Sequence, residues 1–238
     1  MNISDFAAKG AIPKVMLVSL GLPRKLTVKD IGDIGEGLNA GAREYDAYVI
    51  GGDTGEASDL VICLSVFGMA KKNEVMLRSG AEPGDLVALT GSFGKTTAGL
   101  KILLGEMKAP KEIREVLVES VLVPHARLKE GLALSRTKAV TAAIDSSDGL
   151  AWSLHEIARA SRVGFLINNI PIPKEVEKFA EINKLDPLEL TLYGGEEYEL
   201  VLTIKPKLWK QAQRAVEKVG GKLLSIGAVT AERRVLLE

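Results

Sequence analysis

The sequence has one cysteine, few aromatic residues and no excess of charge. Aromatic residues make up 5% of its 238 residues, and 31 lysines and arginines balance 31 aspartates and glutamates. Cys63 cannot form an internal disulfide, and because it lies in the apolar run 60–66 we expect it to be a small core residue. Zero net charge without a basic block gives no electrostatic reason to expect nucleic acid or an anionic membrane as the main partner.

Long hydrophobic runs and zinc-type ligand spacing are also lacking. No window approaches the roughly 18 apolar residues of a membrane span, and the N-terminus lacks the basic and apolar parts of a signal peptide. We therefore expect a cytoplasmic protein. His125 and His155 have no cysteine or histidine neighbours at metal-ligand spacing, which argues against zinc.

What remains is the composition of an ordinary globular chain, 46% hydrophobic and 26% charged, long enough for one large or two small domains. Short β-rich runs alternate with helical patterns, which predicts an α+β fold. We expect strands at 14–19, 47–50, 60–68, 86–90, 139–144, 164–167, 199–204 and 222–229. We expect helices at 28–44, 96–104, 111–119, 126–134, 150–160, 174–182 and 208–219. The Pro83-Gly84 turn predicts a division into an N-terminal part, residues 1–80, and a C-terminal part, residues 81–238.

Two motifs place aspartates at the predicted ends of strands. In Val49-Ile-Gly-Gly-Asp-Thr-Gly55, the glycines let a ligand approach the backbone, and Asp53 suits a cation; a simple Gly-Asp turn is the alternative. In Asp145-Ser-Ser-Asp-Gly-Leu150, two carboxylates flank a helix start, which suits Mg²⁺ with phosphate. Plain capping of that helix by Ser146 or Ser147 is the alternative there.

Further acidic residues lie at the ends of other predicted elements. Glu196 and Glu197 follow paired glycines in the run 193–200, where a charged turn is the simpler interpretation. Asp5 lies early in a short helical segment, 2–8, where it would otherwise belong to a capped helix start. Together with the aspartates above, these carboxylates would form a cluster of like charge that needs a cation. The cation most compatible with a nucleotide is Mg²⁺.

Two basic or glycine-rich features have simpler alternatives. Arg78 precedes the proposed junction and is placed to reach a phosphate, or else is an exposed loop arginine. Thr90-Gly-Ser-Phe-Gly-Lys-Thr-Thr97 looks like a phosphate-binding P-loop, but Leu89 occupies the position of the first glycine, so the spacing fails. We expect only a glycine-rich turn into a helix there.

Six motifs in order closely resemble those of the thiamine-monophosphate kinase family, which belongs to the superfamily of aminoimidazole ribonucleotide synthetase and selenophosphate synthetase. They are Asn2-Ile-Ser-Asp-Phe-Ala-Ala8, Gly51-Gly-Asp-Thr54, Arg78-Ser-Gly-Ala81 with Pro83-Gly-Asp85, Thr90-Gly-Ser-Phe-Gly94 with Ala98-Gly-Leu100, Asp145-Ser-Ser-Asp-Gly-Leu150 and Gly194-Gly-Glu-Glu-Tyr-Glu-Leu200. The resemblance covers nearly the whole chain. It implies a two-part aminoimidazole ribonucleotide synthetase-like architecture, with mixed sheets covered by helices.

The resemblance also implies an activity and a site. The activity is phosphorylation of thiamine phosphate to thiamine diphosphate with ATP and Mg²⁺, by direct in-line transfer in a homodimer that pairs through sheets of its N-terminal halves. By motif, the magnesium ligands would be Asp5, Asp53, Asp145 and Asp148. ATP would contact Gly52, Asp53, Arg78 and Ser147, and thiamine phosphate would contact Glu196. The resemblance assigns no residue as a nucleophile.

The sequence departs from the family pattern in three places. The family's N-terminal portion, with a Gly-Asp-Asp motif, further metal ligands and a substrate-binding histidine, has no counterpart before Met1. A C-terminal aromatic that packs on the substrate is missing, and Ile34-Gly-Glu36 replaces an aromatic on the nucleotide side. Two alternatives follow: a sister ATP-using enzyme with another acceptor, or a non-catalytic paralogue that binds nucleotide.

Overall fold

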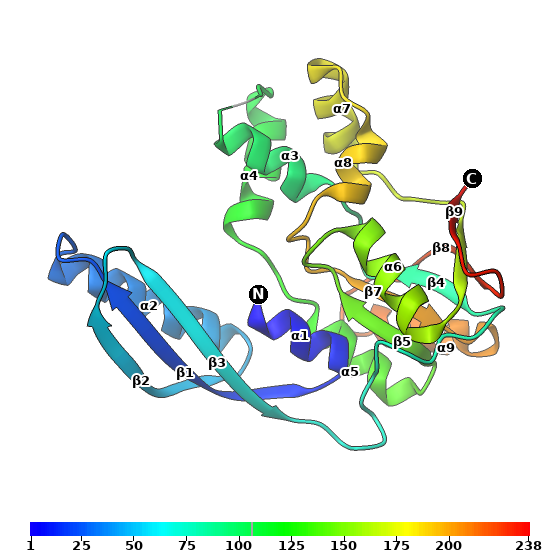
Figure 1. The fold of residues 1–238 in the computed structure, drawn as a ribbon, viewed down its shortest axis with the longest axis horizontal. Helices are drawn as coiled ribbons and strands as arrows, with labels where there is room; N and C mark the ends of the chain where they lie inside the picture. Colours follow the sequence, from blue (N-terminus) through cyan, green and yellow to red (C-terminus); the bar gives the residue numbers. More distant parts are fainter. Residues whose placement is uncertain (106) are drawn as a thin grey trace.

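The computed structural model of the chain describes residues 1–105 and 107–238. Its strands form two separate sheets, one of three strands and one of six. The three-stranded sheet, here called sheet A, extends to one side, and the six-stranded sheet B lies within the helical body (Figure 1). No helix within the described ranges is long and apolar enough to cross a membrane.

Sheet A has β1 (Ile12–Leu22) at its centre, parallel to β2 (Tyr48–Glu56) and antiparallel to β3 (Val61–Met69). The long helix α2 (Val28–Glu44) connects β1 to β2, as a parallel strand pair requires. It begins with a capping box: the Asp30 amide donates to the Thr27 hydroxyl at 3.2 Å, and the Thr27 amide donates to the Asp30 carboxylate at 2.8 Å. This helix covers one face of sheet A.

Sheet B has the strand order β5-β7-β4-β8-β6-β9. The bounds are β4 (Leu86–Leu89), β5 (Val140–Asp145), β6 (Gly164–Ile167), β7 (Leu200–Ile204), β8 (Leu224–Thr230) and β9 (Val235–Leu237). All neighbouring pairs are antiparallel except β6 and β9.

Helices cover both faces of sheet B. On one face lie α1 (Asn2–Lys9), α5 (Leu128–Thr137) and α9 (Trp209–Glu217), which follows the short 3₁₀ helix η1 (Pro206–Leu208). On the other lies α6 (Leu150–Ser161). Along β7, Leu200 and Leu202 pack on the first side and Val201 on the second, because alternate residues of a strand point to opposite faces. Both core faces of sheet B are therefore filled.

The remaining helices form a group of their own above the sheet (Figure 1). They are α3 (Lys95–Leu103), α4 (Lys111–Leu122), α7 (Lys174–Asn183) and α8 (Pro187–Tyr193). They share a small apolar core that includes Ile102, Leu117 and Phe179. This group holds the glycine-rich turn before α3 next to the end of α8.

All the predicted helices and strands are present, with shifted ends for most of them. Three short elements were not predicted: η1, α8 and β9. The Asp186-Pro187 start of α8 is a helix signal that was available, because the Asp186 carboxylate accepts from the Leu188 amide at 2.8 Å and proline suits the first turn. The expectation for Cys63 is wrong: it is exposed, because no element within the described ranges covers its face of β3.

Candidate functional site

Helix α1 places Asp5 beside the end of β5. Its buried face packs on α5 so closely that a Cβ at Gly131 would overlap the backbone oxygen of Ala7. Gly10 ends the helix in the left-handed conformation, with φ 64°. Because Ala7 and Ala8 face inward, Asp5 lies on the outer side of the helix.

The loop between β5 and α6 presents Asp145, Ser147 and Asp148. The Ser153 hydroxyl donates to the Ser146 hydroxyl at 3.0 Å, and the Ser147 hydroxyl donates to the Asp148 carboxylate at 2.9 Å. The alternative interpretation, in which Ser146 or Ser147 caps the helix, is wrong. The N-cap is Gly149, without a side-chain hydrogen bond, because both serine hydroxyls are engaged elsewhere. The aspartates are therefore surplus to capping.

The loop before β7 lies directly on the β5–α6 loop. The Glu196 amide donates to the Ser147 carbonyl at 2.7 Å, and a Cβ at Gly195 would overlap that carbonyl. Glu196 and Tyr198 both have left-handed backbone, with φ of 63° and 53°. Such conformations cost about 1–3 kcal/mol each in non-glycine residues and concentrate at functional sites. The contact brings Glu196 next to the two aspartates.

The charges of these carboxylates act on the same neighbouring groups. Burial and then the charges of Glu196, Asp145, Asp148 and Asp5 together raise the pKa of the Tyr198 hydroxyl to about 12. Partial burial and then the charge of Asp145 raise the pKa of the Asp5 carboxyl. Four of the predicted acidic site residues thus form one cluster, called the acidic cluster below.

Cationic groups flank the acidic cluster. The segment before Arg78 runs along β5, since the Ala143 amide donates to the Leu77 carbonyl at 2.8 Å. Burial lowers the pKa of the Lys9 ammonium, and the charge of Arg78 lowers it further, while Asp145 and Asp5 act in the opposite direction. Arg78 is therefore within reach of the same charges as Asp5.

Asp53 and Gly52 lie elsewhere. The strand β2 continues to Glu56, so Asp53 is inside a strand and not at its end as predicted, because pairing with β1 persists past a bulge at Met16/Leu17. Among the described residues, Asp53 is not one of the charges that shift the pKa of the Tyr198 hydroxyl or of the Asp5 carboxyl. The strand β2 lies in sheet A, away from β5 (Figure 1). A Cβ at Gly52 would overlap the Val18 backbone oxygen, so this position requires glycine. One chain alone does not join Asp53 to the acidic cluster.

Two further glutamates of the same motif point away from the acidic cluster. Glu197 is largely buried and accepts hydrogen bonds from the backbone amides of Gly94, at 2.5 Å, and Thr96, at 3.2 Å. These are the amides that a P-loop would offer to phosphate, so an internal carboxylate occupies them. Burial raises the pKa of the Glu197 carboxyl, and the hydrogen bonds oppose the shift.

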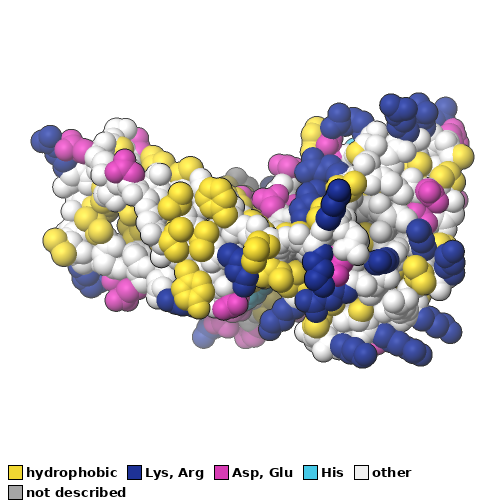
Figure 2. Space-filling view, turned by 90° about the horizontal axis from the view of Figure 1, so that it is seen from below, with side chains coloured by type: hydrophobic (Ala, Val, Ile, Leu, Met, Phe, Trp, Pro, Cys, Tyr) yellow, Lys and Arg dark blue, Asp and Glu magenta, His cyan; other side chains and the backbone are white. Residues whose placement is uncertain are grey.

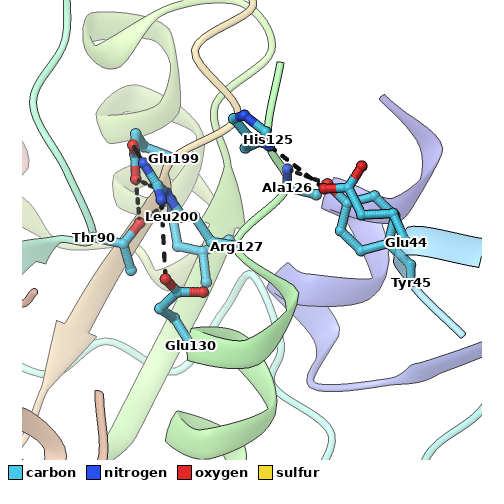
Figure 3. A network of polar contacts seen from close by, with 9 residues as sticks. All are labelled: Glu44, Tyr45, Thr90, His125, Ala126, Arg127, Glu130, Glu199 and Leu200. Atoms are coloured by element: carbon cyan, nitrogen blue, oxygen red, sulfur yellow. Dashed lines mark hydrogen bonds and ion pairs between the residues drawn. The ribbon is translucent and has the colours of Figure 1, made fainter. Parts of the chain in front are cut away.

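Glu199 belongs to a network that joins sheet B to α2 (Figure 3). Its carboxylate accepts from the Thr90 hydroxyl at 2.7 Å and from Arg127 Nε at 2.9 Å. Next to Arg127, the Ala126 amide donates to the Tyr45 hydroxyl at 3.0 Å. The sequence indicated Glu197 only as part of a charged turn, and it did not predict Glu199 or Arg127. A carboxylate at the start of the predicted strand 199–204 was the available signal, because a buried charge needs a partner.

The acidic cluster suits a hard cation that brings part of its own ligand shell. Within residues 1–105 and 107–238, no three Asp, Glu, His or Cys side chains converge closely enough to hold a metal by themselves. Mg²⁺ usually keeps several waters and binds one or two carboxylates together with substrate phosphates. The donor set therefore fits Mg²⁺ bound with a nucleotide better than a closed structural site.

Comparisons with known proteins identify the family of the chain. Residues 1–70 match the family described as AIR synthase related protein, N-terminal domain, and residues 82–238 match its C-terminal domain. A thiamine-monophosphate kinase of Nitrosopumilus maritimus is 35% identical over 236 residues, covering 99% of this chain and 74% of that protein. One of Pyrococcus horikoshii is 42% identical, covering 86% of this chain; the aligned region spans 63% of that protein's length.

Solved structures give the same assignment. AaThiL complexed with AMPPCP and TMP superposes with a TM-score of 0.88 at 28% identity, covering 99% of this chain and 73% of that one. Thiamine-monophosphate kinase from Stenotrophomonas maltophilia gives a TM-score of 0.90 at 27% identity, covering 100% and 75%. Hydrogenase maturation protein HypE of E. coli, at 22% identity and a TM-score of 0.80, shares the fold. The chain belongs to the thiamine-monophosphate kinase family.

Proposed function

We propose that this chain transfers a phosphoryl group from ATP to thiamine phosphate, giving thiamine diphosphate, in a Mg²⁺-dependent reaction. The observation that carries the proposal is the convergence of Asp5, Asp145, Asp148 and Glu196 from three separate segments, with Arg78 beside them. The relative AaThiL, solved with AMPPCP and TMP, supports the choice of both substrates.

Each residue of the acidic cluster has a proposed role. Asp5, Asp145 and Asp148 hold Mg²⁺, and Ser147 and Arg78 contact the nucleotide. Glu196 contacts thiamine phosphate, because its amide hydrogen bond to the Ser147 carbonyl holds it beside the loop of the aspartates. Mg²⁺ supplies charge neutralisation of the phosphates when bound.

The chain's own part in the chemistry is positioning. Phosphoryl transfer needs alignment and charge stabilisation more than a covalent intermediate, so the absence of an assigned nucleophile fits direct in-line transfer. The guanidinium of Arg78 offers paired donors to phosphate oxygens. Gly195 lets the two loops approach until Ser147 and Glu196 share a hydrogen bond, which fixes donor-side and acceptor-side residues relative to each other.

We further propose a homodimer that pairs through the open face of sheet A. Helix α2 covers the face of Met16, because Met16, Leu64 and Val66 line a hollow with α2. The opposite face carries Tyr48 and Phe67, which are 46% and 55% exposed and pair with the same residue of β1. Figure 2 shows hydrophobic side chains gathered over this end of the molecule.

The position of Asp53 links the proposed dimer to the proposed ATP and Mg²⁺ site. It pairs with Ser19 of β1, as does Cys63 of β3, so these residues form a row on the open face. A second chain on that face would lie against Gly52 and Asp53, the remaining residues proposed for ATP and Mg²⁺. The cytoplasmic location expected from the sequence stays a prediction.

The test is a two-step measurement on the purified, folded chain. Mg·ATP is titrated calorimetrically, thiamine phosphate is then added, and ADP and thiamine diphosphate are quantified. We expect binding with turnover, and loss of turnover in Asp145→Asn with unchanged circular dichroism. Binding without turnover in the parent chain would favour a non-catalytic paralogue, and faster turnover of another phosphorylated acceptor in a panel would favour a sister enzyme.

A further inference from the structure

A second concentration of charge lies on sheet B, where α6 ends beside β9 (Figure 1). Here a hollow of about 340 Å³ is lined by His155, Arg159 and Arg162 from the end of α6 and by Arg233 and Arg234 from the segment before β9. In a chain with zero net charge, four guanidiniums around one hollow form a local positive field. We call it the arginine hollow.

The backbone on both sides of the arginine hollow is fixed. Arg162 ends α6 in the left-handed conformation, with φ 59°. On the other side, the Phe165 amide donates to the Arg234 carbonyl at 2.8 Å. A Cβ at Gly164 would overlap the Glu232 carbonyl, so the turn lies tightly against β6. The arginines therefore extend from two anchored segments.

The charges in the arginine hollow are only partly compensated. Arg159 donates to the Glu156 carboxylate at 3.1 and 2.9 Å, and Arg234 lies 3.2 Å from Glu232. Arg162 and Arg233 have no ion-pair partner among the described residues. Their donors remain available to an outside anion.

The donors and the size of the arginine hollow select the ligand class. A guanidinium presents paired, planar donors that match phosphate oxygens, and several of them recognise phosphoryl groups better than isolated charges do. A hollow of about 340 Å³ accommodates a small phosphorylated anion.

Glu156 connects the arginine hollow to the nucleotide site. Besides Arg159, its carboxylate lies 3.7 Å from Arg78 Nη1 and is 14% exposed. One carboxylate thus serves an arginine of each site. An anion that engages Arg159 releases Glu156 toward Arg78, which then has less positive charge to offer to ATP.

We propose that the arginine hollow binds a small di- or monophosphate anion and, through Glu156, weakens the binding of nucleotide at Arg78. The first half is independent of the reaction, and the second rests on the proposed role of Arg78. Because coupling between two binding sites is reciprocal, bound nucleotide should weaken the binding of the anion by the same factor.

The first half is tested by calorimetric titration of inorganic pyrophosphate into the chain with EDTA and no nucleotide, so that the Mg²⁺-dependent site is disabled. We expect saturable binding that Arg162→Gln/Arg233→Gln weakens at least tenfold. A charge-matched control, Arg114→Gln/Arg214→Gln, changes two exposed arginines outside the arginine hollow and should bind as the parent does. Equal binding by all three proteins overturns the site. Tighter, hollow-dependent binding of a DNA oligonucleotide overturns the assignment to small anions.

The second half is tested by titrating Mg·ATP with and without saturating pyrophosphate at constant free Mg²⁺. We expect pyrophosphate to lower the affinity for Mg·ATP several-fold in the parent chain and in the control variant. The effect should disappear in Arg162→Gln/Arg233→Gln. Weakening that persists in this variant means direct competition at the nucleotide site and overturns the coupling. If ATP binds none of the proteins, the coupling and the proposed nucleotide role of Arg78 both fail, while the EDTA titration still decides the anion site.

Discussion

Strands β2 and β7 represent opposite environments in one chain. Every residue of β2 is exposed, whereas every residue of β7 is buried. The difference lies in what covers the two sheets: helices pack on both faces of sheet B, whereas α2 and part of α1 pack on one face of sheet A. Sheet B is complete within the chain, and sheet A presents an apolar face without a partner.

The same contrast separates the two halves of the candidate site. Asp145 is at the end of a strand whose neighbours are fully packed, and its surroundings are set by Ser146, Ser153 and the loop before β7. Asp53 is on the open sheet, and its carboxylate accepts only a local hydrogen bond from the Thr54 amide, at 2.9 Å, among the described contacts. A carboxylate on sheet B is positioned by its own chain, whereas one on sheet A depends on what covers the sheet.

Among these substitutions, one that breaks the polar network of sheet B should have the largest effect on the stability of the chain. In Glu199→Ala, Arg127 and Thr90 lose their shared carboxylate, whose side chain is 6% exposed. Arg127, whose side chain is 35% exposed, would keep, among the described contacts, only its 3.9 Å contact to Glu130, and the buried Thr90 hydroxyl would lose its acceptor, so we expect a loss of about 2–3 kcal/mol in the free energy of unfolding. Urea unfolding followed by circular dichroism measures it.

The control for this substitution is an exposed ion pair. Lys29 and Asp33 lie 3.1 Å apart on α2 with both side chains mostly exposed, so Asp33→Ala should change the unfolding free energy by less than about 0.5 kcal/mol. Equal small effects from both substitutions would mean that the Arg127–Glu199 pair contributes no more than a surface pair.

A charge introduced on the open face of sheet A should weaken the association of two chains into the proposed dimer. In Phe67→Asp, an aromatic side chain that is 55% exposed in the single chain is replaced. Burying such a side chain in a dimer contributes about 1.5–3 kcal/mol per chain, so the dimer dissociation constant should rise at least tenfold. Analytical ultracentrifugation measures it, and unfolding of sheet B should not change. A variant that stays dimeric places the interface elsewhere.

The sequence predicted the position of Asp145 and Asp148 because their signals are local. Asp145 and Asp148 follow a strand and precede a helix, and that juxtaposition survives folding almost unchanged. The expectation for Cys63 failed for a different reason. A continuous apolar run is typical of a strand buried on both faces, and the sequence does not tell whether the cover comes from the same chain.

The residues that were missed depend on tertiary contacts. Arg127 is 72 positions away from Glu199 in the sequence, and Glu197 reaches amides 103 positions away at Gly94. Only the assembled fold joins such pairs. The arginine hollow is of the same kind, because Arg162 and Arg233 meet through the pairing of β6 with β9.

Asp148→Asn should sharpen the distinction between a site residue and a capping residue. The substitution removes one negative charge from the acidic cluster, so Mg·ATP affinity should fall about tenfold, which corresponds to about 1.4 kcal/mol. The melting temperature without Mg²⁺ should be unchanged or raised, because repulsion within the acidic cluster decreases. Calorimetry and thermal unfolding measure the two effects. A large fall in melting temperature with unchanged affinity would make Asp148 a structural residue.

Glu197→Gln should change the melting temperature least at any one pH. The pH dependence of that change tells whether burial or the hydrogen bonds dominate the pKa of the Glu197 carboxyl. Burial raises the pKa of the Glu197 carboxyl above its ordinary 4.5, so the folded chain holds this proton more tightly than the unfolded chain does. The stability that this contributes is fully present below pH 4.5 and is lost as pH rises through the raised pKa. Glutamine accepts from the same Gly94 and Thr96 amides but does not titrate. The melting temperature of the parent chain minus that of the variant should therefore decrease from pH 4.5 toward neutrality. An increase over the same range would show that the two amides stabilise the charged carboxylate more than burial opposes it.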